Sequence, residues 1–172
     1  MNNCLIIAHP RSGSTNLMKS IASGNNIMSC FEPFGPHRGN LNGNKCVKVI
    51  VSRKTNEFYL NLCNSYEKVV LLARRDTKLA AESLTKLYAN GGYPIAPWVS
   101  LTKEEEKKIP RYIEKIDRDK DNLAILSKAL DIPIDYYEDV YTNMTLLDTS
   151  IKLDVSYLDN SKKLKKTKLN IL

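Results

Sequence analysis

The sequence predicts an α/β protein, a three-layer α/β/α domain with a mainly parallel sheet. A short apolar run at residues 5–8, a segment of high β-propensity at 45–52 and a second apolar run at 69–73 indicate strands. The last run is apolar throughout, which is typical of a strand covered on both faces. Apolar residues at helical spacing follow the first and last runs. Strands that alternate with helices in this way favour parallel pairing.

The first strand ends at His9 and Pro10, because proline has no amide hydrogen to give to a neighbouring strand. A helix is expected after it, with its apolar positions between residues 17 and 22. Residues 27–31 are a candidate second strand, and they lead into a proline-containing loop that ends at His37. The spacing of apolar residues over 55–66 predicts a further helix.

In the second half of the chain, Asp76 is placed to cap a helix that ends at Gly91 and Gly92. The spacing predicts an inward-facing stripe on this helix, formed by Leu79, Ala80, Leu84, Leu87 and Tyr88. Residues 102–130 are predicted to be mostly helical with a break near Pro110, and residues 133–137 are a short strand candidate.

Length and composition bound the class of protein. The 172 residues suit a single domain over 1–172, whose last part, about 160–172, is a basic tail. No apolar run approaches the roughly 18 residues of a membrane span, and the N-terminus does not resemble a signal peptide, so a cytoplasmic protein is expected. Four cysteines without a C-x-x-C pair, and two histidines, indicate thiols and no metal site.

The net charge of +7 suggests an anionic partner, and six lysines fall within residues 152–168. A nucleotide, an acidic polymer and a nucleic acid would all fit this charge. The sequence contains no zinc finger, RRM signature or clear helix-turn-helix, so nucleic acid is not expected as the partner. The sequence does not indicate an oligomeric state.

A first candidate anion site lies between the first strand and the following helix. It consists of Arg11, Ser12, Gly13, Ser14 and Thr15. Free amides at a helix N-terminus bind anions, and this turn adds an arginine and three hydroxyl groups. It is not a Walker A motif, which requires a lysine after its second glycine. The alternative is a serine-rich turn that only caps the helix.

A second candidate anion site pairs Arg75, at the end of the strand at 69–73, with Ser83 in the next helix. Ser83 falls in the apolar stripe, where a hydroxyl group needs a partner. That partner is either a phosphate shared with Arg75 or the carbonyl of Leu79. The neighbouring Arg74 is predicted to be a surface arginine. Both candidate sites follow strands, where α/β folds bind their ligands.

These two motifs resemble those of the PAPS-dependent sulfotransferases, where PAPS is 3′-phosphoadenosine 5′-phosphosulfate. Pro10–Thr15 is similar to their 5′-phosphosulfate loop, and Arg75–Ser83 is similar to their 3′-phosphate motif. Two segments, Phe31–Phe34 and the tripeptide Arg74–Asp76, are most similar to the bacterial and phage-type branch of the family. Tyr137–Val140 resembles a segment that occurs later in the family's sequences. The resemblance implies a P-loop NTPase-like fold, with the matches in family order over residues 5–140.

The resemblance also implies the roles of the site residues. PAPS would be the sulfuryl donor and PAP the product, without a metal, and the acceptor would be a hydroxyl or amine of a carbohydrate or other small molecule. Arg11, which stands where cytosolic members have a lysine, would stabilise the leaving group. Glu32 is the first candidate for the base and His37 the second. The family's downstream nucleotide loop can correspond only to the lysine-rich tail, and Lys166 is its candidate contact.

Two other functions remain open at this stage. A P-loop kinase or NTPase would share the fold, but it would lack the Walker lysine and would leave the Arg75–Ser83 pair without a 3′-phosphate. A non-enzymatic basic module that binds an acidic polymer would account for the lysines but not for the paired anion sites at strand ends.

Overall fold

A computed structural model describes residues 3–34, 43–91 and 100–141 of the protein. Its five strands form one sheet in the order β2-β3-β1-β4-β5, and every neighbouring pair is parallel. The strands are β1 (Cys4–Ala8), β2 (Met28–Phe31), β3 (Lys45–Ile50), β4 (Lys68–Ala73) and β5 (Ile134–Tyr136). The prediction of an α/β protein with a mainly parallel sheet is therefore confirmed.

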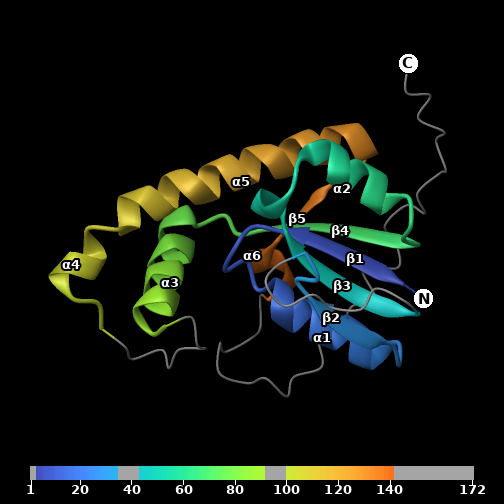
Figure 1. The fold of residues 1–172 in the computed structure, drawn as a ribbon, viewed down its shortest axis with the longest axis horizontal. Helices are drawn as coiled ribbons and strands as arrows, with labels where there is room; N and C mark the ends of the chain where they lie inside the picture. Colours follow the sequence, from blue (N-terminus) through green and yellow to red (C-terminus); the bar gives the residue numbers. More distant parts are fainter. Residues whose placement is uncertain (1–2, 35–42, 92–99, 142–172) are drawn as a thin grey trace.

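Helices cover both faces of this sheet (Figure 1). They are α1 (Ser14–Gly24), α2 (Asn56–Cys63), α3 (Thr77–Ala89), α4 (Lys103–Glu106), α5 (Ile109–Leu130) and α6 (Tyr137–Val140), with a 3₁₀ turn η1 (Val51–Arg53) after β3. Helix α1 packs on one face through Leu17, Met18 and Ile21. Helices α2 and α5 pack on the other through Tyr59 and Leu123. This arrangement is consistent with three layers.

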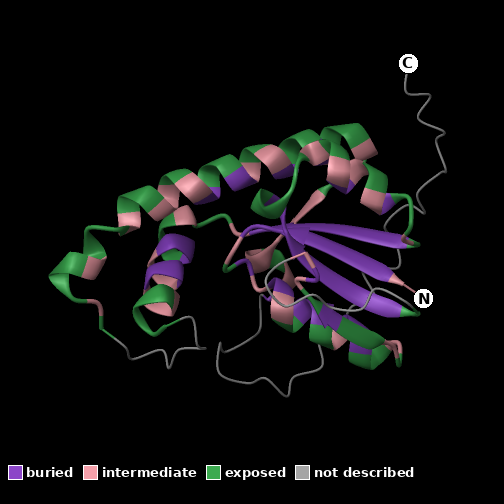
Figure 2. Cartoon of the chain, viewed as in Figure 1, coloured by how far each residue is buried: buried purple, intermediate pink, exposed green. Residues whose placement is uncertain are grey.

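The central strands are buried along their whole length. All residues of β1, β3 and β4 are buried, and Figure 2 shows these three strands as the interior of the molecule. Alternate residues of β1 contribute to the two cores, with Leu5 and Ile7 on the side of α2 and α5, and Ile6 on the side of α1. Two-sided burial explains the continuous apolar runs of β1 and of β4 after Lys68, whereas β3 also buries Lys45 and Lys48.

Helix α3 differs from the prediction in the face that it buries. Ala80, Ala81, Leu84 and Thr85 are its buried residues. Leu79 and Tyr88, which were predicted to face inward, are 48% and 55% exposed. The buried face is narrower because α3 packs against another helix, α5, around Ile116 rather than directly on the sheet. Small residues allow this close helix contact, so the stripe predicted from large apolar residues was wrong at its edges.

The order of the strands fixes where a ligand site can form. Strand β1 lies between β3 and β4, so the chain continues on one side of β1 through β2 and β3 and then crosses to the other side at β4. The segments that follow neighbouring parallel strands such as β1 and β4 emerge at the same edge of the sheet. In open α/β sheets, the point where the strand order reverses is where ligands bind.

Candidate functional site

The turn between β1 and α1 has an unusual backbone. Arg11 has a φ of 64° and Gly13 a φ of 80°, so two residues in a tight turn adopt the left-handed conformation. Ser12, between them, is fully buried, and its Oγ has no hydrogen-bond partner. A buried hydroxyl without a partner is costly, so Oγ of Ser12 is a candidate to bind a ligand or a water in this turn.

The hydroxyl groups of this turn do not cap α1. The N-cap residue is Gly13, and no side chain accepts a hydrogen bond at the cap. The interpretation of the turn as a serine-rich cap is therefore wrong. Ser14 is buried in the first turn of α1 and Thr15 is half-buried. The amides of a first helical turn have no intrahelical partner, and the helix dipole gives this end a positive potential.

Arg11 extends from the turn to α3. Its Nε donates a hydrogen bond to Oγ of Ser83 at 2.8 Å. Although the residue as a whole is exposed, packing around the guanidinium lowers the pKa of Arg11, and the positive charge of Arg74 lowers it further. An arginine stays protonated despite such a shift. The hydrogen bond from Arg11 goes to the neutral hydroxyl of Ser83, which does not compensate the positive charge of the guanidinium.

Arg74 also lies beside this turn, and the prediction of a surface arginine is wrong. Its side chain is only 14% exposed. The guanidinium lies over the ring of Tyr137, 4.7 Å from its centroid, and the buried Nε has no hydrogen-bond partner. The nearest carboxylate oxygen, Oε1 of Glu138, is 3.9 Å from Nε. Because the charge of Arg74 also acts on Arg11, two cations lie near each other where the turn after β1 emerges.

The side chain of Arg75 is bound by a different partner, Asp139. Its guanidinium donates two hydrogen bonds to the carboxylate of Asp139, both of 2.6 Å, and lies over the ring of Tyr136 at 4.4 Å. Ser83 bonds to Arg11 instead, so the structure does not bring the predicted pair Arg75 and Ser83 into contact. The physical reason is the alternation of a strand exit, which directs consecutive side chains to opposite sides.

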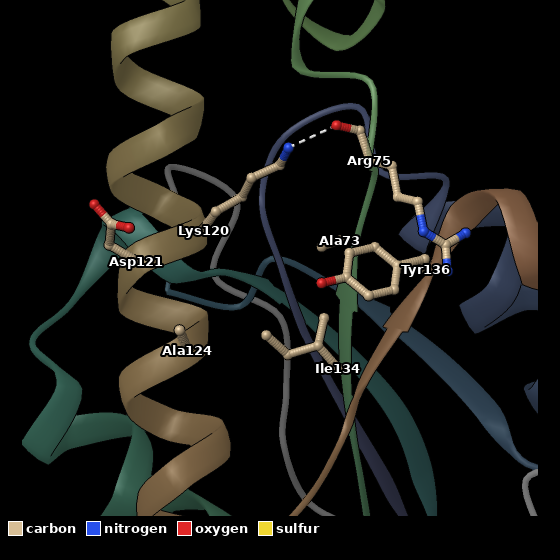
Figure 3. A pocket seen from close by; sticks show the side chains of 7 residues that line it. All are labelled: Ala73, Arg75, Lys120, Asp121, Ala124, Ile134 and Tyr136. Atoms are coloured by element: carbon tan, nitrogen blue, oxygen red, sulfur yellow. Dashed lines mark hydrogen bonds between the residues drawn. The ribbon is translucent and has the colours of Figure 1, made fainter.

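Arg75 also lines a cleft of about 460 Å³ between α5 and the ends of β4 and β5. Figure 3 shows Tyr136 and Ile134 on one side of this cleft and Ala124 of α5 on the other. The Nζ of Lys120 donates to the backbone oxygen of Arg75 at 3.0 Å and so closes one end. The cleft lies on the α5 side of the sheet, away from α1.

His9 connects the turn to the end of β4. Its side chain is fully buried, Nδ1 lies 2.7 Å from the Pro10 oxygen, and Nε2 lies 2.8 Å from the Arg74 nitrogen. The Arg74 amide must donate, so Nε2 accepts and Nδ1 carries the proton. Burial lowers the pKa of His9 to about 4, which keeps the ring neutral. The sequence analysis missed this role, although a histidine directly after a buried strand is an available signal.

Helix α6 closes over the turn from the C-terminal side. The hydroxyl of Tyr141 donates to the Gly13 oxygen at 2.7 Å, and the rings of Tyr137 and Tyr141 stack at 4.6 Å. A Cβ atom at Gly13 would lie 2.6 Å from a ring atom of Tyr137. The carboxylate of Glu138 accepts hydrogen bonds from the Arg75 amide at 3.0 Å. The segment at Tyr137–Val140 is therefore part of the site's wall, a role that spacing alone could not show.

Glu32 follows β2 at the same edge of the sheet. It adopts a φ of 40°, and its Oε1 accepts from Nζ of Lys48 at 2.5 Å. Its Oε2 lies 3.6 Å from Arg53. The charge of Arg11 acts on Lys48, which places Glu32 and Lys48 in the electrostatic neighbourhood of the turn. The second candidate base, His37, and the candidate nucleotide contact, Lys166, lie outside the described residues.

Over residues 3–34, 43–91 and 100–141, no group of three potential metal ligands is found, and no helix is long and apolar enough to cross a membrane. All four cysteines are free and buried. No protein-family model matches this sequence, and no curated protein matches it either.

Proposed function

We propose that the protein is a PAPS-dependent sulfotransferase with a P-loop NTPase-like fold. One observation carries the proposal: the turn before α1 holds a buried hydroxyl, Oγ of Ser12, that has no hydrogen-bond partner among the described residues, and beside it in the sequence stands Arg11, a cation that is also under the influence of the Arg74 charge. A phosphate or sulfonate supplies both the negative charge and the acceptor oxygens that these groups lack. The residues present therefore fit a ligand that carries several anionic groups close together.

The two predicted halves of the nucleotide site form one cluster, because Oγ of Ser83 accepts a hydrogen bond from Nε of Arg11. In the proposal, the amides of Gly13–Thr15 and the hydroxyl of Ser12 hold the 5′-phosphosulfate. Ser83 and an arginine after β4 hold the 3′-phosphate. Arg74 is the better candidate for that arginine, since its charge acts on Arg11 and its buried Nε has no hydrogen-bond partner, whereas the guanidinium of Arg75 is bound by Asp139. This choice revises the sequence-based assignment of Arg75.

PAPS would supply an activated sulfuryl group, so the protein has to align the reactants and stabilise charge. Arg11 is placed to offset the negative charge that develops on the bridging oxygen. Glu32 is proposed to take the proton of the acceptor hydroxyl. The acceptor is proposed to be a carbohydrate or another small molecule with a hydroxyl or amine group, and no step requires a metal.

The proposal is tested by thermal unfolding with PAP, ADP, and ATP with magnesium. A ligand that binds only the folded state at about a hundredfold excess over its Kd stabilises the protein by about 2.7 kcal/mol. For a domain of this length, that corresponds to a rise in Tm of roughly 5–10 °C. PAP should raise Tm clearly more than ADP, because ADP has no 3′-phosphate. Equal shifts for PAP and ADP, or a larger shift with ATP, would favour a kinase, and no shift would favour a polymer-binding module.

The neighbouring arginines provide a matched pair of variants for this experiment. Arg74→Ala should remove most of the advantage of PAP over ADP, because a lost charge-assisted contact costs about 1.5–3 kcal/mol. Arg75→Ala should keep that advantage, since its guanidinium is paired with Asp139. The reverse result would assign the 3′-phosphate to Arg75. If PAP kept the same advantage over ADP in both variants, neither arginine would bind the 3′-phosphate.

A further inference from the structure

Lys48 is a buried cation that the proposed reaction does not yet use. It belongs to the central part of β3, and its side chain is 5% exposed. Its partners in the sheet register are Ile6 on β1 and Phe31 on β2, both apolar. A buried ammonium group needs a compensating partner. Its long side chain therefore extends along the sheet to the carboxylate that follows β2.

Three charged groups act on this lysine. Nζ of Lys48 lies 2.5 Å from Oε1 of Glu32 and 4.2 Å from the ring centroid of Phe31. Burial lowers the pKa of Lys48, Glu32 raises it, and Arg11 and Arg53 lower it. Within the part of the chain that the structure describes, Glu32 is thus the single carboxylate among the charges that act on Lys48, and the other two come from the turn after β1 and from η1.

Glu32 is tied to Lys48 by its backbone as well as by its side chain. The Glu32 amide donates to the Lys48 oxygen at 2.8 Å. Glu32 adopts the left-handed conformation, with a φ of 40°, which costs about 1–2 kcal/mol for a residue other than glycine. A strained residue held by two contacts to one neighbour has a fixed position, and such strain is concentrated at functional sites.

The two carboxylate oxygens of Glu32 are consequently not equivalent. Oε1 is occupied by Lys48, whereas the contact of Oε2 with Arg53, at 3.6 Å, is longer than a hydrogen bond. Oε2 is therefore the oxygen that remains able to accept a proton.

We propose that Lys48 is a positioning residue, which holds Oε1 of Glu32 so that Oε2 faces the acceptor hydroxyl. This inference rests on the proposed sulfuryl transfer. In that step the acceptor oxygen forms a bond to sulfur, and its proton passes to Oε2 of Glu32. The bond from sulfur to the 5′-phosphate oxygen breaks, and its electron pair stays on PAP. Lys48 keeps its own protons throughout.

The test measures hydrolysis of PAPS to PAP and sulfate, in which water takes the place of the acceptor. Lys48→Met should lower kcat on the order of 10²-fold, the cost of a misplaced catalytic group, with KM for PAPS unchanged. Lys45→Met is the matched control, because Lys45 is also a buried lysine of β3 but is the first residue of the strand. Wild-type kcat in Lys48→Met, or an equal loss in Lys45→Met, would overturn the inference.

Lys48→Arg keeps the experiment informative if Lys48→Met does not fold. Wild-type kcat should decline in alkaline solution as Lys48 loses its proton, and it should do so below the ordinary titration range of lysine. Arginine stays protonated there, so Lys48→Arg should retain activity without this decline. The same alkaline decline in Lys48→Arg would rule out Lys48 as its cause and contradict the inference.

A measurement without turnover separates this inference from the proposed function. The ε-carbon NMR resonance of Lys48 should titrate below the range of an exposed lysine. It should titrate lower still in Glu32→Gln, because Glu32 raises the pKa of Lys48. An unchanged titration in that variant would contradict the pair. The PAP-induced rise in Tm should be the same in Lys48→Met and wild type, so its absence in wild type would count against the sulfotransferase and not against the pair.

Discussion

Nε of Arg11 and Oγ of Ser83, 72 residues apart in the sequence, lie 2.8 Å from each other. The hydrogen bond joins the turn after β1 to the middle of α3. It brings together two segments that the sequence analysis treated as separate anion sites. Since Arg74 acts on the same guanidinium, the end of β4 belongs to this cluster too.

Removing the cation of the turn should weaken nucleotide binding. Arg11→Ala is expected to raise the Kd for PAP about 10- to 100-fold, the equivalent of a lost charge-assisted hydrogen bond. Ser83→Ala should have a smaller effect, because a hydroxyl contributes no charge. Isothermal titration with PAP measures both. Unchanged affinity in Arg11→Ala would make this residue structural only.

Replacing the proposed base should affect turnover and not binding. Glu32→Gln is expected to lower kcat roughly 10²- to 10⁴-fold, the usual contribution of general base catalysis. The affinity for PAP should stay close to that of wild type, because Glu32 contacts Lys48 rather than the turn. Stopped assays of PAPS turnover and titrations with PAP provide the two values. Near-normal kcat would move the role to His37 or to solvent.

Gly13 is expected to tolerate no side chain. Gly13→Ala places a methyl group 2.6 Å from a ring atom of Tyr137 on a residue with a φ of 80°. Gly43 has a φ of 85° with nothing within 4 Å, so Gly43→Ala isolates the backbone cost of about 1–2 kcal/mol. Chemical denaturation should show a clearly larger loss of unfolding free energy for Gly13→Ala. Equal losses of unfolding free energy in the two variants would mean that α6 moves to accommodate the methyl group without a loss of stability.

The buried His9 should make the protein less stable in acid. Its folded-state pKa is about 4 and its ordinary value is 6.5, so between these values the unfolded chain binds a proton that the folded chain does not. The resulting stability, roughly 3 kcal/mol, is present above pH 6.5 and is lost as the pH falls towards 4.

Denaturation across this range should show the loss in wild type and a smaller one in His9→Gln, which cannot titrate there. His37→Gln is the control, since it removes the chain's other histidine. Its stability should follow that of wild type. A slope that is the same in His9→Gln and wild type would assign the acid sensitivity to carboxylates.

Several features of the site escaped the sequence analysis for a common reason. The choice between Arg74 and Arg75 depends on which side of the sheet each side chain faces when β4 ends. Tyr141, directly after α6, reaches Gly13 across 128 positions of sequence. The helix break before Pro110, by contrast, was predicted correctly, because α4 ends at Glu106 and α5 begins at Ile109. Proline acts on its own backbone, whereas the contacts of an arginine depend on its surroundings.

The sequence by itself determined the α/β class, the parallel sheet and the capping of α3 by Asp76, which accepts from the Leu79 amide. These features follow from local apolar patterns and backbone preferences, which depend on residues close together in the sequence. Only the tertiary structure decided that the charge of Arg74 acts on Arg11 while Arg75 pairs with Asp139. The same holds for the burial of Ser12, whose Oγ has no partner among the described residues, and for the pairing of Lys48 with Glu32. Each of these depends on the order of strands in the sheet, because that order sets which charged groups share the low-dielectric edge where their interactions are strong.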